Sequence, residues 1–140
     1  MQQLSTYLHF GGNCEEAFKY YQKILGGDIT MMLPYQGTPA EGEVPGDWKG
    51  KIIHANLQLG DKQILGCDSP PQYFSQPQGF SMTLFVDTPA EVDRIFNGLA
   101  DGGRVRMPLD KTFFAERFGM LTDRFGIPWM VGCNPTAPGS

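Results

Sequence analysis

The sequence predicts an α+β fold in which a βαβββ module occurs twice. Two amphipathic helices, beginning near Asn13 and Thr88, show the same capping and apolar spacing 75 positions apart. Each follows an alternating apolar strand and precedes stretches with hairpin signals. The 18 glycines and 11 prolines indicate many short elements joined by turns and disfavour a helical bundle. Because capping, strands and hairpins repeat together, we interpret the chain as an internal duplication.

The first helix is expected to begin after Asn13, an N-cap residue, with Glu16 completing a variant of the capping box. Its buried stripe follows helical spacing, and Gly26-Gly27 ends it, as glycines do at helix C-termini. A strand is expected before it, at 4–10. The strands expected after it cover 29–35, 52–59 and 63–67, with Gly60-Asp61 as the last turn.

The second helix is expected to begin after Thr88, with Pro89 at its first position and Glu91 three residues after the cap. Its apolar stripe again has helical spacing, and Gly102-Gly103 ends it. A strand is expected at 80–86. The strands expected after this helix cover 104–109, 112–122 and 127–132.

Length and charge limit the function classes. A chain of 140 residues fits a single domain spanning 1–140, with module one at 1–69, a linker at 70–78, module two at 79–133 and a frayed tail at 134–140. The formal net charge is −4 and no Lys/Arg run occurs, which disfavours nucleic-acid binding. No apolar stretch approaches the length of a membrane span, and the N-terminus does not resemble a signal peptide. Three widely spaced cysteines indicate a reduced, cytoplasmic protein.

Segment 36–50 is rich in glycine, proline and acidic residues. A loop of this length inside a compact domain is uncommon, and it is expected either to be functional or to form a mobile surface insertion. Trp48 is the exception, because a large apolar ring is expected to cover other apolar groups.

Strand parity predicts which side chains face away from the helices, because successive side chains point to opposite faces of a sheet. Leu4, Leu8 and Phe10 are expected to pack on the first helix. The opposite faces are polar and aromatic, which favours a concave ligand cleft over simple exposure to water. The ligand-binding candidates are Tyr7, His9, Asn56, Ser81, Thr83, Phe85 and Trp129, the last expected in the core or the cleft wall.

Three further residues have both a possible chemical role and a structural interpretation. His54 shares its expected face with His9 and is a candidate catalytic residue, although a histidine on a strand is often structural. Glu116 lies among phenylalanines, where it is either a catalytic acid–base group or an exposed partner of Arg117. Cys67 is expected to be a small buried hydrophobe more readily than a nucleophile.

The residues also resemble a known family. Segments 7–27 and 51–68, and above all 113–129 with its Glu116-Arg117-Phe118-Gly119, are similar to the PhnB-like branch of the vicinal-oxygen-chelate superfamily. That superfamily includes glyoxalases, extradiol dioxygenases and bleomycin- and fosfomycin-resistance proteins. Arg124 departs from the family pattern, which has proline there. The resemblance implies paired βαβββ modules forming a U-shaped mixed sheet around a cleft, with the helices outside, and commonly a homodimer.

The resemblance also implies where a metal would bind. Transferring the superfamily's ligand positions residue by residue gives Ser5, one residue within 65–68, Ser81 and Met130. Serine and methionine are poor ligands for hard divalent cations, so we expect no standard metal site and no cofactor. A displaced metal site is the alternative, made of His9, His54 and Glu116.

Three functions remain open at this point, and it is open whether the protein is an enzyme. The favoured one is a cleft that binds a small molecule without a standard metal site. The second is a glyoxalase-type lyase, isomerase or transferase acting on a small carbonyl substrate, with Glu116 or His54 as general base and a metal stabilising the oxyanion. The third is a non-catalytic dimeric interaction module. Members of this family are often called methyltransferases, but this sequence has no glycine-rich nucleotide loop that would support that activity.

Overall fold

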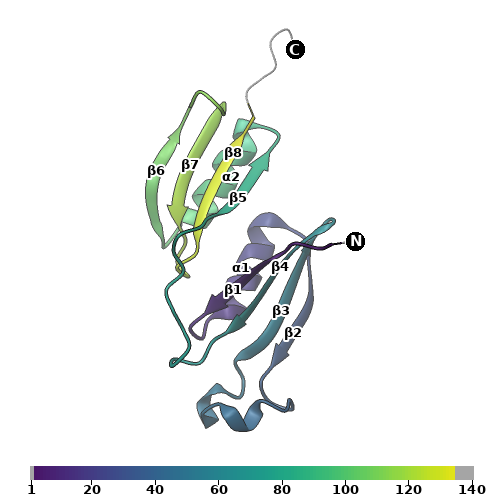
Figure 1. Ribbon diagram of the computed structural model, residues 1–140. Coiled ribbons are helices and arrows are strands. Elements are labelled where there is room, and N and C mark those ends of the chain that lie inside the picture. The colour runs from purple at the N-terminus through teal and green to yellow at the C-terminus, as the bar shows by residue number, and fades with distance from the viewer. Residues whose placement is uncertain (1, 135–140) are drawn as a thin grey trace. The chain divides into compact units, whose positions relative to one another are not determined.

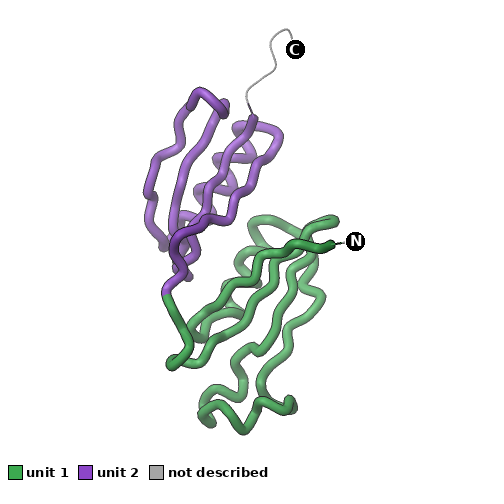
Figure 2. Tube along the Cα trace, viewed as in Figure 1, with its two compact units in different colours: residues 1–75 green, residues 76–140 purple. Residues whose placement is uncertain are grey.

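A computed structural model of the protein describes residues 2–134. The chain divides into two compact units, residues 1–75 and 76–140, here called unit one and unit two (Figure 2). Apart from Asn134, the expected frayed tail lies outside the described residues. No helix in the described part of the chain combines the length and the apolar character needed to cross a membrane.

Unit one is the first predicted βαβββ module, and it forms a four-stranded mixed sheet in the order β1-β4-β3-β2 (Figure 1). Strand β1 pairs with β4 in parallel, and the other pairs are antiparallel. The predicted strand at 52–59 is confirmed to the residue. The elements are β1 (Thr6–Phe10), α1 (Cys14–Leu25), β2 (Asp28–Pro34), β3 (Ile52–Leu59) and β4 (Lys62–Asp68).

The core of unit one lies between α1 and one face of this sheet. Leu8 and Phe10 of β1 are each 1 % exposed and pack on the helix side, as parity predicts. Phe18 of α1 meets Phe10 edge-on at a ring distance of 6.2 Å. It also covers Gly66 of β4 so closely that a Cβ there would lie 2.7 Å from Phe18 Cε1. The expectation for Leu4 is wrong: it precedes β1 and is fully exposed.

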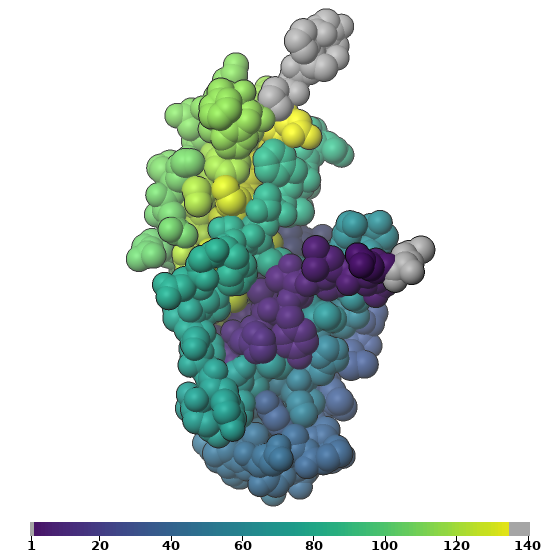
Figure 3. Space-filling model, in the orientation of Figure 1, coloured from purple at the N-terminus to yellow at the C-terminus, as the bar shows by residue number. Residues whose placement is uncertain are grey.

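Segment 36–50 is folded, which corrects the expectation of a structureless loop. It contains two short 3-10 helices, Glu41–Glu43 and Gly46–Trp48. Trp48 is 8 % exposed and meets Tyr35 edge-on at a ring distance of 6.4 Å, so it does cover apolar surface as predicted. Figure 3 shows this segment, in blue, as a continuous patch of atoms on unit one.

Unit two is the second predicted module, with a four-stranded mixed sheet in the order β5-β8-β7-β6. The side chain of Thr88 accepts a hydrogen bond from the Glu91 backbone N–H, which confirms the predicted cap. The strand expected at 112–122 begins only at Arg117, because residues 112–115 close a turn on the Thr112 hydroxyl. The elements are β5 (Met82–Val86), α2 (Pro89–Ala100), β6 (Arg104–Asp110), β7 (Arg117–Thr122) and β8 (Pro128–Cys133).

Candidate functional site

Each sheet carries its unit's helix on one face, and the opposite face is here called the open face. On β1 the two faces alternate as predicted, with Tyr7 and His9 exposed between buried neighbours. The parallel register sets His9 of β1 opposite Cys67 of β4. His54 of β3 joins the same open face. The fold of unit one therefore brings both histidines and one cysteine to one surface.

Tyr7 lies at the centre of these side chains. Its hydroxyl is 3.1 Å from His54 Nδ1, and its ring centre lies 5.1 Å from that of His9 and 5.7 Å from that of His54. His9 Nδ1 is 3.0 Å from Ser69 Oγ and 3.5 Å from Cys67 Sγ. We call Tyr7, His9, His54, Cys67 and Ser69 the Tyr7 cluster.

Two members of the Tyr7 cluster have pKa values above their ordinary ones. Desolvation, helped by the neighbouring Cys67, raises the pKa of the Tyr7 hydroxyl far above its ordinary value. Desolvation also raises the pKa of the Cys67 thiol, although hydrogen bonds from Ser69 and Tyr7 act in the opposite direction. Near neutral pH the cluster therefore offers a hydroxyl and a thiol proton beside two imidazoles, which can exchange hydrogen bonds with a polar ligand.

A second chain of hydrogen bonds includes Asn56 of β3. Its amide donates to Gln63 Oε1 at 3.1 Å, and the Gln63 amide donates to Ser5 Oγ at 3.1 Å. The other amide atom, Asn56 Oδ1, is buried and has no hydrogen-bond partner among the described residues. A buried acceptor without a protein partner is costly, and this atom has almost no surface that a molecule on the open face could reach.

The open face of unit two has a different composition. Thr83 and Phe85 of β5 are exposed on it, and Ser81 immediately precedes that strand. The Thr83 hydroxyl donates to the Met130 sulfur at 3.8 Å, which places Met130 on this face. Phe85 lies 6.3 Å from the ring of Phe118. This face offers hydroxyls, a thioether and aromatic rings.

Trp129 does not lie on the open face, so its expected role in ligand contact is corrected. It pairs with Met82, whose side chain is on the helix side of β5, and it is 2 % exposed. Its indole N–H donates to Asp123 Oδ2 at 2.9 Å. Neighbouring side chains alternate between faces, so Met130 rather than Trp129 faces outward. Trp129 is a core residue, one of the two alternatives that its sequence position allowed.

Glu116 belongs to unit two and both histidines belong to unit one. Glu116 is half-buried just before β7, where its backbone N–H donates to the Cys133 carbonyl at 3.1 Å. Arg117 forms an ion pair with Asp93 of α2. The structure therefore assigns Arg117 to a contact with α2.

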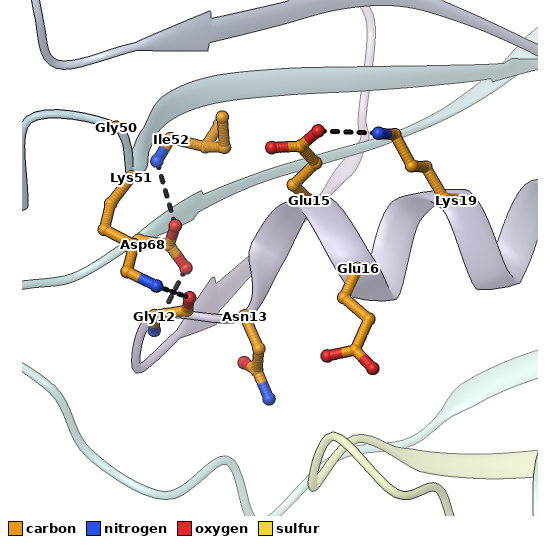
Figure 4. A pocket seen from close by; sticks show the side chains of 9 residues that line it. All are labelled: Gly12, Asn13, Glu15, Glu16, Lys19, Gly50, Lys51, Ile52 and Asp68. Carbon is orange, nitrogen blue, oxygen red and sulfur yellow. Dashed lines mark hydrogen bonds and ion pairs between the residues drawn. The ribbon is translucent and has the colours of Figure 1, made fainter.

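In unit one, Asp68 lines a hollow of about 450 Å³ at the start of α1 (Figure 4). Its Oδ1 accepts from the backbone N–H groups of Gly12 and Cys14 at 3.0 and 2.9 Å. Its Oδ2 accepts from Ile52 at 2.9 Å. Asn13 makes no capping bond with its side chain, so the predicted capping box is wrong and Asp68 performs that role. The hollow is thus built around a structural carboxylate.

Comparison with known proteins defines the family. The family model described as 3-demethylubiquinone-9 3-methyltransferase matches residues 2–132. The chain belongs to this family. Protein YjdN of Escherichia coli strain K12 is 33% identical over 96% of this chain and 97% of its own length.

Two solved structures extend the likeness. Protein PA1353 of Pseudomonas aeruginosa is 47% identical, with a TM-score of 0.88 over 96% of this chain and 98% of that one. A Bacillus cereus PhnB protein, titled a putative 3-demethylubiquinone-9 3-methyltransferase, is 28% identical, with a TM-score of 0.80 over 94% and 99%. These confirm the resemblance to PhnB-like proteins. Glyoxalase-related and fosfomycin-resistance structures, 15% and 10% identical, share the fold alone.

The metal positions expected from the PhnB-like resemblance do not suit a metal. The Ser5 hydroxyl accepts from Gln63, and the Met130 sulfur accepts from Thr83. Within 65–68, both carboxylate oxygens of Asp68 accept from backbone N–H groups. Residues 2–134 contain no group of three or more His, Cys, Asp or Glu side chains arranged to hold a metal ion. The donor set therefore does not fit the superfamily's metal centre.

Proposed function

We propose that this PhnB-like protein binds a small molecule at the open face of unit one. The observation that carries the proposal is the Tyr7 cluster: a tyrosine, two histidines and a cysteine in mutual contact on a face that its own helix does not cover. Titratable groups with shifted pKa values that gather on one surface mark a candidate functional site.

The composition of the face indicates the kind of ligand. The ring of Tyr7 is tilted by 38° to that of His9 and by 34° to that of His54, so each ring offers a face of its own to a planar group. The Tyr7 hydroxyl, the Cys67 thiol and the two imidazoles can donate or accept hydrogen bonds. A planar molecule with both a donor and an acceptor suits these groups. The methyltransferase in the family description is not part of the proposal, because no G-x-G-x-x-G motif occurs in the sequence.

Ligand binding measured on variants of the open face tests the proposal. A library of planar polar compounds is screened by thermal shift, and the dissociation constants of the hits are measured by calorimetry. Tyr7→Phe removes only the hydroxyl beside His54 Nδ1 and is expected to weaken binding roughly 3- to 10-fold, the worth of one hydrogen bond. His54→Ala removes the imidazole that meets Tyr7, and Asn56→Ala breaks the hydrogen bond to Gln63 on the same face; both are expected to weaken binding.

The matched control for that screen is Lys62→Gln, an exposed change at the start of β4 that touches none of the Tyr7 cluster. It is expected to bind every hit as the unaltered protein does. Hits that bind Tyr7→Phe, Asn56→Ala and His54→Ala with unchanged affinity would show that the ligand site lies elsewhere.

A further inference from the structure

Cys67 differs from the other two cysteines in its surroundings. Cys14 and Cys133 are buried, whereas Cys67 is half-buried and unpaired with any other cysteine. Its sulfur lies 3.5 Å from His9 Nδ1 and 3.9 Å from Ser69 Oγ. Those two atoms are themselves 3.0 Å apart. The thiol, the imidazole and the hydroxyl therefore form a triangle across β1 and the end of β4.

We propose that Cys67 is a nucleophile toward small α,β-unsaturated carbonyl compounds, with His9 as its general base. A thiol within reach of an imidazole is the pair of groups found in activated cysteine sites. Ser69 meets the same imidazole nitrogen as the thiol, so its hydroxyl and the thiol compete for His9 Nδ1. The inference deepens the proposed function and rests on it, since the electrophile must first occupy the open face of unit one.

The base is essential because burial raises the pKa of the Cys67 thiol, so little thiolate is present before a base acts. In the tautomer that carries its proton on Nε2, His9 Nδ1 has one lone pair, which accepts from the thiol when the hydrogen of the Ser69 hydroxyl points elsewhere. The imidazole is exposed and can take the thiol proton as the sulfur attacks.

The reaction balances without an oxidant or a further reactant. The sulfur of Cys67 forms a bond to the β-carbon of the ligand while its proton moves to His9 Nδ1. The π electrons of the carbon–carbon double bond move toward the carbonyl and give an enolate. The imidazolium of His9 then returns the proton to the α-carbon, leaving a thioether.

The class of electrophile follows from the neighbours of the sulfur. A soft thiolate favours a soft carbon, and the flat face of an enone can stack on the ring of Tyr7, which is tilted by 38° to that of His9. Tyr7 is protonated near neutral pH, desolvation raises its pKa further, and its hydroxyl interacts with Cys67. The Tyr7 hydroxyl can donate a hydrogen bond to the carbonyl oxygen of the ligand, where the negative charge of the enolate develops.

N-ethylmaleimide, a planar α,β-unsaturated dicarbonyl, is the probe for the test. The labelling rate of Cys67 is followed by intact mass and peptide mapping on the full-length chain. His9→Ala is expected to slow labelling about 100-fold, the contribution of a positioned base, and imidazole added to that variant is expected to restore part of the rate. Lys62→Gln is the control and is expected to react as the unaltered protein does.

Two results would overturn the proposal: labelling of Cys67 at the same rate in His9→Ala, or no labelling of Cys67 in the folded protein. His9→Gln, which keeps a polar side chain, repeats the test should His9→Ala lose its native circular dichroism. Cys67→Ser separates this proposal from the proposed function, because it cannot form the thioether. If reversible hits from the ligand screen still bind Cys67→Ser, the proposed binding site is supported independently of the thiol. The labelling rates then decide whether Cys67 is a nucleophile.

Discussion

Replacing Asp68 with asparagine tests the account of how unit one is held together. The carboxylate is 1 % exposed and accepts backbone hydrogen bonds from Gly12, Cys14 and Ile52, which join β4 to the start of α1 and of β3 (Figure 4). Asparagine keeps one oxygen and turns an N–H donor toward at least one of these donors. Losing a hydrogen bond to a charged group and leaving a buried N–H without an acceptor costs about 3–5 kcal/mol together.

Urea unfolding followed by fluorescence measures that cost. Trp48 reports on unit one and Trp129 on unit two, and both are buried. With a denaturant slope of about 2 kcal/mol/M, Asp68→Asn is expected to lower the midpoint by roughly 2 M. Asp61→Asn, at the exposed turn between β3 and β4, is the matched control and should change stability by less than about 0.5 kcal/mol. A loss below about 1 kcal/mol for Asp68→Asn would refute the three-bond account.

Three further predictions are read from the same unfolding measurement. Thr88→Ala should cost about 1 kcal/mol because its hydroxyl caps α2, whereas Asn13→Ala should cost almost nothing; equal losses would contradict this. Gly66→Ala should cost about 1–3 kcal/mol, because the new Cβ meets Phe18, and a neutral result would show that the ring moves freely. Burial raises the pKa of the Cys14 thiol above its ordinary 9.0, so above about pH 9 the thiol ionises in the unfolded chain first and the free energy of unfolding falls. Cys14→Ala should make the free energy of unfolding less dependent on pH in this range. An unchanged dependence would mean that another group causes it.

The elements of this fold could be predicted because their signals are local. Alternating burial on β1 and the helical stripe of α1 follow directly from the period of each structure. The cap of α1 could not be predicted, since Asp68 lies 56 positions beyond Gly12 and no spacing rule joins them. The late start of β7 has a local cause that competed with strand propensity: the Thr112 hydroxyl accepts from the backbone of Ala115 and closes a turn.

The sequence predicted some residues of the candidate site but not the contacts between them. Parity placed Tyr7, His9 and His54 on one face, and the structure adds that they touch. Ser69 and Gln63 were not predicted, because nothing in their flanking sequence marks them. The position of Cys67 beside His9 depends on the register of β1 against β4. A register between strands about 60 residues apart follows from packing, which a single sequence does not display.

The duplication allows the open faces of the two modules to be compared. Both units repeat the order of elements and each contains a buried aspartate that accepts several N–H groups, but the two aspartates stand at different places: Asp68 ends β4, whereas Asp123 lies between β7 and β8. The backbone plan was therefore kept while its supporting side chains diverged. On the open faces the divergence is chemical. Unit one has imidazoles, a phenol and a thiol, whereas Thr83 and Met130 of unit two offer no group that titrates near neutral pH. Since the scaffold is common to both, the proposed binding site is assigned to unit one by the side chains of its open face and not by its backbone.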